Sequence, residues 1–309
     1  MNWKKGMQPI DFSSKHHILL ANDYDESIVH AMDEPYFESR QIAPGTWQVY
    51  SCGDHTYVVE GEDETLVIDS GYGCGNIRDY CQSLTEKPVY RIANTHNHFD
   101  HTANNYLFDA AYMSRETYEK RTTPFPSFSG LDFPRDYPVV IIDEGYVIDL
   151  GGRQLETFSF CNHAVGSLGW LDRKERIFYV GDEFVSETYG VRYSVAHGVA
   201  MYQKLMDHID AFDLCCGGSG MFEKKDVIRG YNALRRVLEN HPEEWQPFES
   251  FFHPEEALPS MEEPITILRQ APRPWDMPRF RPHPEEDAFK RNFTLDGFTV
   301  SFDIRHIYE

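Results

Sequence analysis

Four side chains of the kinds that bind metal ions lie close together in the chain: His96, His98, Asp100 and His101. If the chain is extended there, His96 and His98 point to the same side, because side chains alternate along a strand. Asp100 and His101 then fall at the turn into the next element, where they can face a second ion. Imidazole and carboxylate ligands suit zinc, iron or manganese, and such sites can leave a coordination position open for water. The spacing therefore predicts a metal site with one or two ions, zinc being the expected metal and iron or manganese the alternatives.

The elements that position this motif can be predicted from hydrophobic periodicity. Residues 65–69 and 89–93 are expected to be strands, and the second of them leads directly into the histidines. Residues 103–111, just after the motif, are expected to form a helix. Further strands are expected at 46–50, 56–60, 139–142, 146–148, 155–158, 169–171, 177–180 and 298–302, and further helices at 76–84, 199–211 and 225–240.

Two segments are expected to shape a substrate pocket. Residues 122–138 combine prolines with aromatic side chains, which excludes a regular element and favours a lid or a pocket wall. Residues 184–193 contain Tyr189, Arg192 and Tyr193, which are expected to line the same partly apolar pocket.

Composition excludes several classes of protein. The 309 residues are 41% hydrophobic and 14% aromatic, which is ample for a globular core. A formal charge of −21 argues against nucleic acid or an anionic membrane as a partner, since both reward a basic surface. A small-molecule substrate remains the expected partner, and a homo-oligomer is an open alternative. With no apolar run behind the first lysines, and with cysteines expected to stay reduced, the expected location is cytoplasmic.

The motif and three further segments resemble the metallo-β-lactamase superfamily. Asp69, in Leu-Val-Ile-Asp-Ser-Gly, is similar to the structural aspartate that supports the family's metal loop. His163, in Cys-Asn-His-Ala-Val-Gly-Ser-Leu, is similar to the third histidine of the first metal site. Asp182, in Tyr-Val-Gly-Asp, is similar to the carboxylate that bridges two metals. The resemblance covers roughly residues 47–220 and implies an α/β fold, a four-layer αββα sandwich with two sheets between helices.

The resemblance has one departure, which concerns the second metal. The family usually closes that site with a histidine in a Gly-His-Gly turn, whereas Ser219 stands at the matching place here. A neutral hydroxyl is a poor zinc ligand, so the second site is left with Asp100, His101 and Asp182. A weak second metal, a single-metal enzyme and a substitute ligand are all open, and His197 and His253 are the substitutes to examine.

The resemblance implies a metal-dependent hydrolase in which metal-activated water attacks a small ester, lactone, thioester or amide. Asp100 is expected to orient that water or to accept its proton. Two alternatives from other classes remain: an iron oxidoreductase on the same fold, and a non-catalytic metal-binding homologue. The expected organisation is an N-terminal extension at 1–40, the metallo-β-lactamase-like domain at 41–240, and a C-terminal extension at 241–309 packed on the same domain.

Overall fold

The computed structural model describes residues 37–51, 54–71, 76–121, 134–249 and 284–309, together with short strands elsewhere. These residues fall into two compact units, each with its own sheets and hydrophobic core. The first unit contains the described residues up to 142, residues 149–153 and the strands between 266 and 271. The second contains residues 143–148, 154–249 and 284–309.

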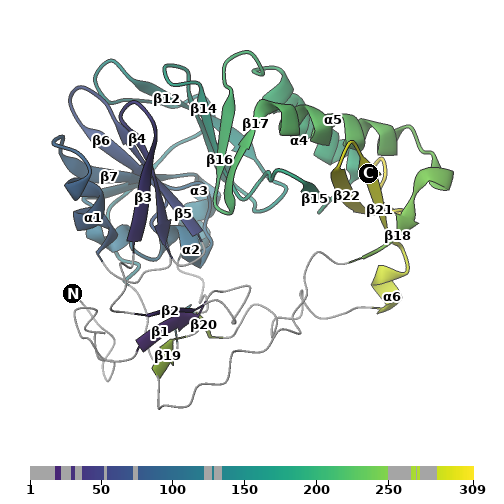
Figure 1. The fold of residues 1–309 in the computed structure, drawn as a ribbon, viewed down its shortest axis with the longest axis horizontal. Helices are drawn as coiled ribbons and strands as arrows, with labels where there is room; N and C mark the ends of the chain where they lie inside the picture. The colour runs from purple at the N-terminus through teal and green to yellow at the C-terminus, as the bar shows by residue number, and fades with distance from the viewer. Residues whose placement is uncertain are drawn as a thin grey trace. The chain divides into compact units, whose positions relative to one another are not determined.

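A seven-stranded mixed sheet forms the centre of the first unit, in the order β10-β8-β7-β6-β5-β4-β3 (Figure 1). Neighbours from β3 to β6 are antiparallel, and those from β6 to β10 are parallel. The strands are β3 (Phe37–Ala43), β4 (Thr46–Ser51), β5 (Asp54–Glu60), β6 (Thr65–Ile68), β7 (Val89–Ala93), β8 (Ala110–Met113) and β10 (Val139–Ile141).

Short elements complete the first unit. Its helices are α1 (Ile77–Ser83), α2 (Phe99–Thr102), α3 (Arg115–Lys120) and the 3-10 turn η1 (Asn105–Leu107). Two small sheets join β1 (Ile18–Ala21), β2 (Val29–Ala31) and β19 (Thr266–Leu268), and β9 (Ser127–Phe128) with β20 (Gln270–Ala271).

The parallel pair β6 and β7 determines where polar side chains gather. Ile68 pairs with Ala93, so both strands end at the same edge of the sheet. Asp69 follows β6, and the metal motif follows β7. The carboxyl ends of parallel strands are a common place for a site, because loops from neighbouring strands meet there.

A six-stranded sheet forms the centre of the second unit, in the order β11-β12-β13-β14-β16-β17. Its strands are β11 (Val147–Asp149), β12 (Gln154–Phe160), β13 (Ser167–Asp172), β14 (Ile177–Gly181), β16 (Leu214–Gly217) and β17 (Gly220–Glu223). A second, four-stranded sheet contains β15 (Thr188–Gly190), β18 (Gln246–Pro247), β21 (Lys290–Leu295) and β22 (Phe298–Asp303). The helices are α4 (Val195–Met206), α5 (Lys224–Leu238), α6 (Pro284–Asp287) and the 3-10 turn η2 (Pro242–Glu244).

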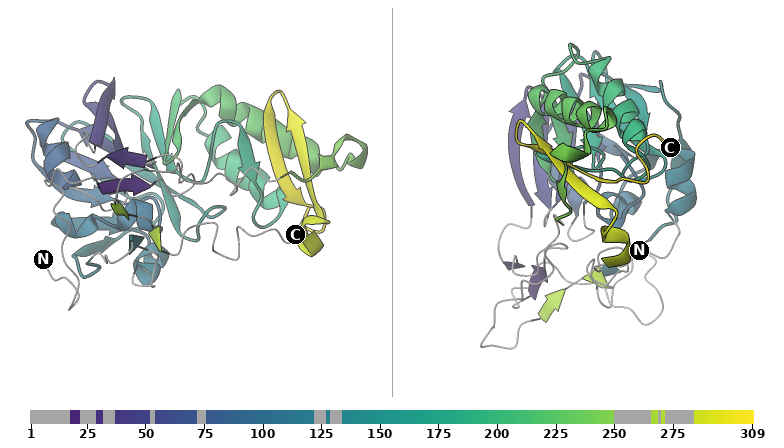
Figure 2. Two further views of the ribbon diagram at one scale, coloured as in Figure 1. Left: turned by 60° about the horizontal axis from the view of Figure 1, so that its bottom comes forward. Right: turned by 90° about the vertical axis from the view of Figure 1, so that its right-hand side faces the viewer.

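The long helices of the second unit lie side by side, and the β21–β22 hairpin packs against α5 (Figures 1 and 2). Their apolar faces meet in a core that includes Tyr202, Leu205, Leu234 and Val300. The C-terminal strands therefore belong to the hydrophobic core of this unit. Among the described residues, no helix has the length and apolar character needed to cross a membrane.

Most of the predicted strands are confirmed, but the helix predicted at 103–111 is wrong. That segment contains the η1 turn and the start of β8. The reason is that Asn104 and Asn105 are buried and bonded to distant groups, and asparagine is a weak helix former. The helix predicted at 199–211 begins earlier, at Val195, because the Ser194 hydroxyl accepts the His197 N–H as an N-cap. Strand β3 runs across the expected boundary at residue 40.

The hairpin between β5 and β6 contains a glycine that the packing requires. Gly61 donates its N–H to Glu64 at 2.9 Å, and a Cβ at Gly61 would collide with the carbonyl group and Cβ of Leu150. Backbone cannot move aside as a flexible side chain can, so we expect Gly61→Ala to destabilise the protein by about 3 kcal/mol. Urea unfolding measures this, with Gly190→Ala as the control because a Cβ there meets nothing within 4 Å. Equal stability of the two variants would contradict the packing argument.

Candidate metal centre

The metal motif forms a tight turn between β7 and α2 in the first unit. His96 lies just beyond the end of β7, and His98 is the N-cap residue of α2. Asp100 and His101 lie within this short helix and are buried. The ring nitrogens His96 Nε2 and His98 Nδ1 are 2.9 Å apart, and the His96 ring centroid is 4.0 Å from that of His101. The structure therefore brings the four predicted side chains of this unit together.

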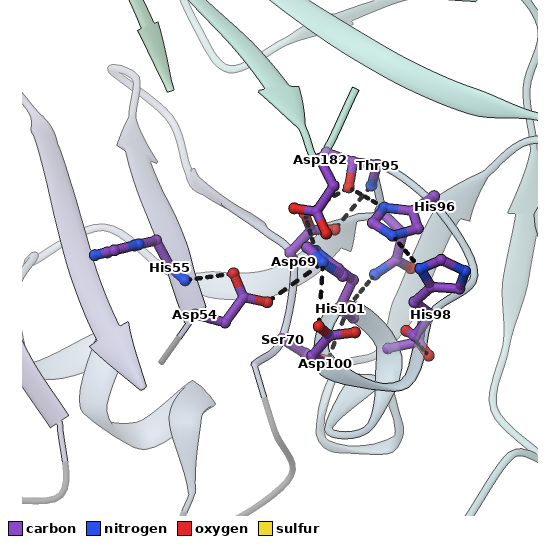
Figure 3. A network of polar contacts seen from close by, with 12 residues as sticks. Asp54, His55, Asp69, Ser70, Thr95, His96, His98, Asp100, His101 and Asp182 are labelled. Atoms are coloured by element: carbon purple, nitrogen blue, oxygen red, sulfur yellow. Dashed lines mark hydrogen bonds and ion pairs between the residues drawn. The ribbon is translucent and has the colours of Figure 1, made fainter. Parts of the chain in front are cut away.

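Asp69 bonds to two parts of this turn (Figure 3). Its Oδ1 accepts the Thr95 backbone N–H at 2.8 Å, and its Oδ2 accepts the Thr95 hydroxyl at 2.7 Å. The same Oδ2 is 2.9 Å from His101 Nδ1. Asp69 has a φ of 60°, a conformation uncommon for residues other than glycine. This turn directs the Asp69 carboxylate towards Thr95 and His101 of the metal motif.

These bonds determine which ring nitrogens are available to a metal. The Thr95 hydroxyl has one hydrogen and gives it to Asp69, so its 3.0 Å contact with His96 Nδ1 requires that Nδ1 carry the proton. An ionised Asp69 likewise requires a proton on His101 Nδ1. In both rings the Nδ1 side faces Thr95 or Asp69, so Nε2 points away from these residues. Metal-binding histidines commonly donate their second nitrogen to a carboxylate or oxygen in this way.

The backbone of the motif is anchored by a buried network of small polar side chains. The His101 carbonyl accepts hydrogen bonds from Ser70 N at 3.0 Å and from Asn94 Nδ2 at 2.8 Å. Asn94 and Asn105 exchange two amide hydrogen bonds, of 3.1 and 2.7 Å. Such networks are worth most when every member is satisfied, and they hold a single loop conformation.

The structure adds one carboxylate that the sequence analysis missed. Asp54, the first residue of β5, is 3% exposed, and its Oδ2 is 3.3 Å from His101 Nε2. The oxygens of Asp54 and Asp100 and the nitrogen of His101 all lie within 4.8 Å of one another. Periodicity predicts that this strand begins at residue 56, which assigns Asp54 to the preceding turn. Nothing in its local sequence indicates a contact with a residue so far along the chain.

The second unit holds the other two predicted ligands, His163 and Asp182. His163 Nε2 is 3.6 Å from Asp182 Oδ2, and both side chains are partly exposed. Their loop is held by Glu183, which is 2% exposed and was not predicted. The Glu183 carboxylate accepts three successive backbone N–H groups, from Asn162 at 2.8 Å, His163 at 3.0 Å and Ala164 at 3.1 Å.

Asp182 follows an irregular end of β14. The register between β14 and β16 shifts next to Gly181, as at a β-bulge, and such irregularities re-aim the side chains beyond them. Gly217 lies beside this point, where a Cβ would come within 2.9 Å of the Gly181 carbonyl oxygen. Ser219 lies in the exposed turn between β16 and β17.

Other residues singled out from the sequence have different environments. His197 lies in the first turn of α4, with its Nε2 3.4 Å from Cys161 Sγ, while His253 lies outside the described residues. Burial raises the pKa of the Cys161 thiol, and the nearby Glu183 charge adds to the shift. The predicted lid at 122–138 lies largely outside the described residues.

Of the predicted pocket residues in the second unit, Tyr189 is packed in the core. It is 3% exposed, and burial raises the pKa of its phenol well above the usual value. Arg192 and Tyr193 are exposed, and the Arg192 guanidinium donates to the His163 carbonyl oxygen. Arg192 therefore lies beside the His163 loop, whereas Tyr189 does not wall a pocket.

Comparison with known families gives the class of this protein. A model of the metallo-β-lactamase superfamily matches residues 51–207, slightly more than half of the chain. The chain belongs to the metallo-β-lactamase superfamily.

Individual relatives are similar over part of the chain. The acyl-coenzyme A thioesterase MBLAC2 of Gallus gallus is 29% identical over 213 residues, which is 57% of this chain and 76% of the relative. MBLAC2 of Homo sapiens is 28% identical over 167 residues, which is 43% of this chain and 60% of the relative. With the family match, these relatives confirm the prediction of a hydrolase enzyme.

Solved structures support the fold. A metallo-β-lactamase from Pontibacter korlensis superposes with a TM-score of 0.51 at 15% identity, covering 64% of this chain and 99% of the other. The sec-alkylsulfatase Pisa1 from Pseudomonas sp. gives a TM-score of 0.52 at 12% identity, covering 66% of this chain and 42% of the other. The predicted αββα fold of the metallo-β-lactamase type is thereby confirmed.

Glu183 offers a test of how the His163 loop is held. In Glu183→Gln, one acceptor oxygen is replaced by an NH2 group that cannot accept, and the three backbone donors lose a charged partner. We expect a loss of about 1–3 kcal/mol in the free energy of unfolding, measured with urea. Glu187→Gln is the matched control, since Glu187 is exposed. The positioning role would be refuted by a Glu183→Gln protein as stable as this control.

Proposed function

We propose that this protein is a metal-dependent thioesterase that hydrolyses acyl thioesters, with acyl-coenzyme A as the substrate class. The observation that carries the proposal is the prearranged motif of the first unit, in which Asp69 and Thr95 orient two imidazoles for metal binding. The thioester bond is suggested by the curated relatives, which are named acyl-coenzyme A thioesterases.

The donor atoms present suit a divalent metal. His96 Nε2 and His98 Nδ1 face one another at 2.9 Å, and a bound cation would be held by these two atoms. We propose His163 as the third ligand of this first site and Asp182 as the ligand shared with a second ion, following the family's motif order. The Glu183 contacts that fix the His163 backbone support this assignment. Zinc is the proposed metal, with iron or manganese as alternatives.

Thioester hydrolysis at this site requires an attacking water and a proton acceptor. A bound divalent metal supplies a lowered water pKa and stabilises negative charge on a carbonyl oxygen. Asp100, buried beside His101, is the proposed group that orients the water and accepts its proton. The water oxygen bonds to the carbonyl carbon, the carbon–sulfur bond breaks, and the proton passes to the leaving thiolate. The products are a carboxylic acid and a thiol.

The acidic charge of the chain affects how strongly anionic substrates bind. Coenzyme A carries several negative charges, whereas this chain has a formal charge of −21. Long-range repulsion therefore opposes binding, and attraction must come from local cations. Arg192 is the proposed local partner in addition to the metal, because its guanidinium lies at the His163 carbonyl. An uncharged acyl thioester is a useful comparison substrate, since it escapes this repulsion.

Metal removal tests the proposed function. We expect chelator-treated protein, His96→Ala and His98→Ala each to lose thioesterase activity by roughly 100-fold or more, the scale of losing a main electrostatic group. Loss of thioester absorbance would be followed with short-chain and long-chain acyl-coenzyme A and with an acyl N-acetylcysteamine thioester. His306→Ala is the control, because this histidine is exposed and lies outside the motif.

Two outcomes would count against the proposal. Full activity after complete metal removal would contradict metal dependence. An iron-loaded protein that consumes oxygen and leaves every thioester intact would favour the oxidoreductase alternative.

A further inference from the structure

Asp54 brings a second buried carboxylate to His101. It is 3% exposed, comes from a different strand than the metal motif, and is held by the His55 backbone N–H, which donates to its Oδ1 at 2.6 Å. Its other oxygen, Oδ2, lies 3.3 Å from His101 Nε2. Figure 3 shows the carboxylates of Asp54 and Asp100 both directed at the His101 ring. This side of the ring is therefore bordered by oxygen from two separate segments.

The protonation of His101 makes this arrangement informative. Its Nδ1 faces Asp69 at 2.9 Å, so in the neutral ring Nε2 carries a lone pair. That lone pair faces Asp54 Oδ2 and, at 3.8 Å, Asp100 Oδ2. Three donor atoms with lone pairs therefore face one another in a buried environment, the geometry of groups that can share one cation. A proton and a divalent metal ion are the two candidates.

The number and kind of donor atoms favour the metal ion. Three carboxylates, those of Asp54, Asp69 and Asp100, lie around the buried His101 ring. A divalent ion can take several such atoms as ligands at once. The atoms of Asp54, Asp100 and His101 lie within 4.8 Å of one another, close enough to share an ion. Two carboxylates and one imidazole form a donor set that suits zinc, manganese or iron.

We propose that Asp54 is a ligand of the second metal ion and takes the place of the histidine that Ser219 replaces. In the first unit the second site is then formed by Asp54, Asp100 and His101, which join Asp182, the ligand proposed above to be shared with the first ion. This inference rests on the proposed metal-dependent function, because it assumes that the motif binds metal. It also explains how the chain dispenses with the usual histidine: the missing ligand comes from the first unit's own sheet.

Metal content tests the assignment without depending on activity. The purified full-length chain would be stripped, titrated with zinc and analysed for bound ions per chain. We expect two ions in the unmodified protein and one in Asp54→Asn, with the affinity of the remaining ion changed by less than about twofold, as expected for a substitution outside the first site. Asp172→Asn is the matched control, since Asp172 is also buried and accepts the backbone N–H groups of Lys174 and Glu175. It should keep two ions.

A second measurement needs no variant and covers the case in which Asp54→Asn fails to fold. In ¹¹³Cd NMR of the cadmium-loaded unmodified protein, we expect two signals, one from a nitrogen-rich and one from an oxygen-rich site. A single signal, or two ions retained in a folded Asp54→Asn protein, would overturn the role of Asp54 and leave the proposed thioesterase intact. Failure of the unmodified protein to bind any metal would instead reject the proposed function, and the inference with it.

Discussion

The carboxylate of Asp69 meets two parts of the metal motif at once. On one side it accepts the backbone N–H and hydroxyl of Thr95, and on the other it faces the imidazole of His101. Through Thr95, the same carboxylate determines which nitrogen of His96 is protonated. One buried carboxylate thus determines the tautomer of two candidate ligands, His96 and His101. Asp69 itself has a left-handed backbone conformation, directly after the end of β6. The chemistry proposed for the site depends on this arrangement, because a ring with the wrong tautomer presents a proton to the metal.

The rest of the first unit is organised so that this anion and the motif meet. Strands β6 and β7 are parallel neighbours, so the residues after them emerge at the same sheet edge. Ser70 and the Asn94–Asn105 amide pair then anchor the backbone of the metal motif, since Ser70 and Asn94 both donate to the His101 carbonyl. In the second unit, Glu183 has a comparable role, since one buried carboxylate holds three successive N–H groups of the His163 loop. In both places a buried carboxylate bonds to backbone N–H groups and so helps to hold one loop conformation.

The sequence predicted the site better where the information is local. His96, His98, Asp100 and His101 lie within six consecutive residues, directly after a segment whose composition is typical of a strand. Asp54 and Glu183 escaped notice because their partners are distant in the chain, and no spacing rule links Asp54 to His101. The helix predicted at 103–111 failed for the same reason, since the tertiary bonds of Asn104 and Asn105 outweigh local propensity. The strands, by contrast, are predicted from the alternation of apolar and polar residues along the chain. That pattern is kept in the fold because one face of each strand packs against the core.

The central claim is that Asp69 presets the imidazoles of the motif for metal binding through Nε2. Long-range ¹H–¹⁵N correlation spectra of zinc-loaded protein with ¹⁵N-labelled histidine test it most directly, with the His96 and His101 signals assigned by single substitutions. The account predicts a protonated Nδ1 and a metal-bound Nε2 in both rings. A protonated Nε2 in either ring, or a spectrum unchanged by zinc, would contradict it.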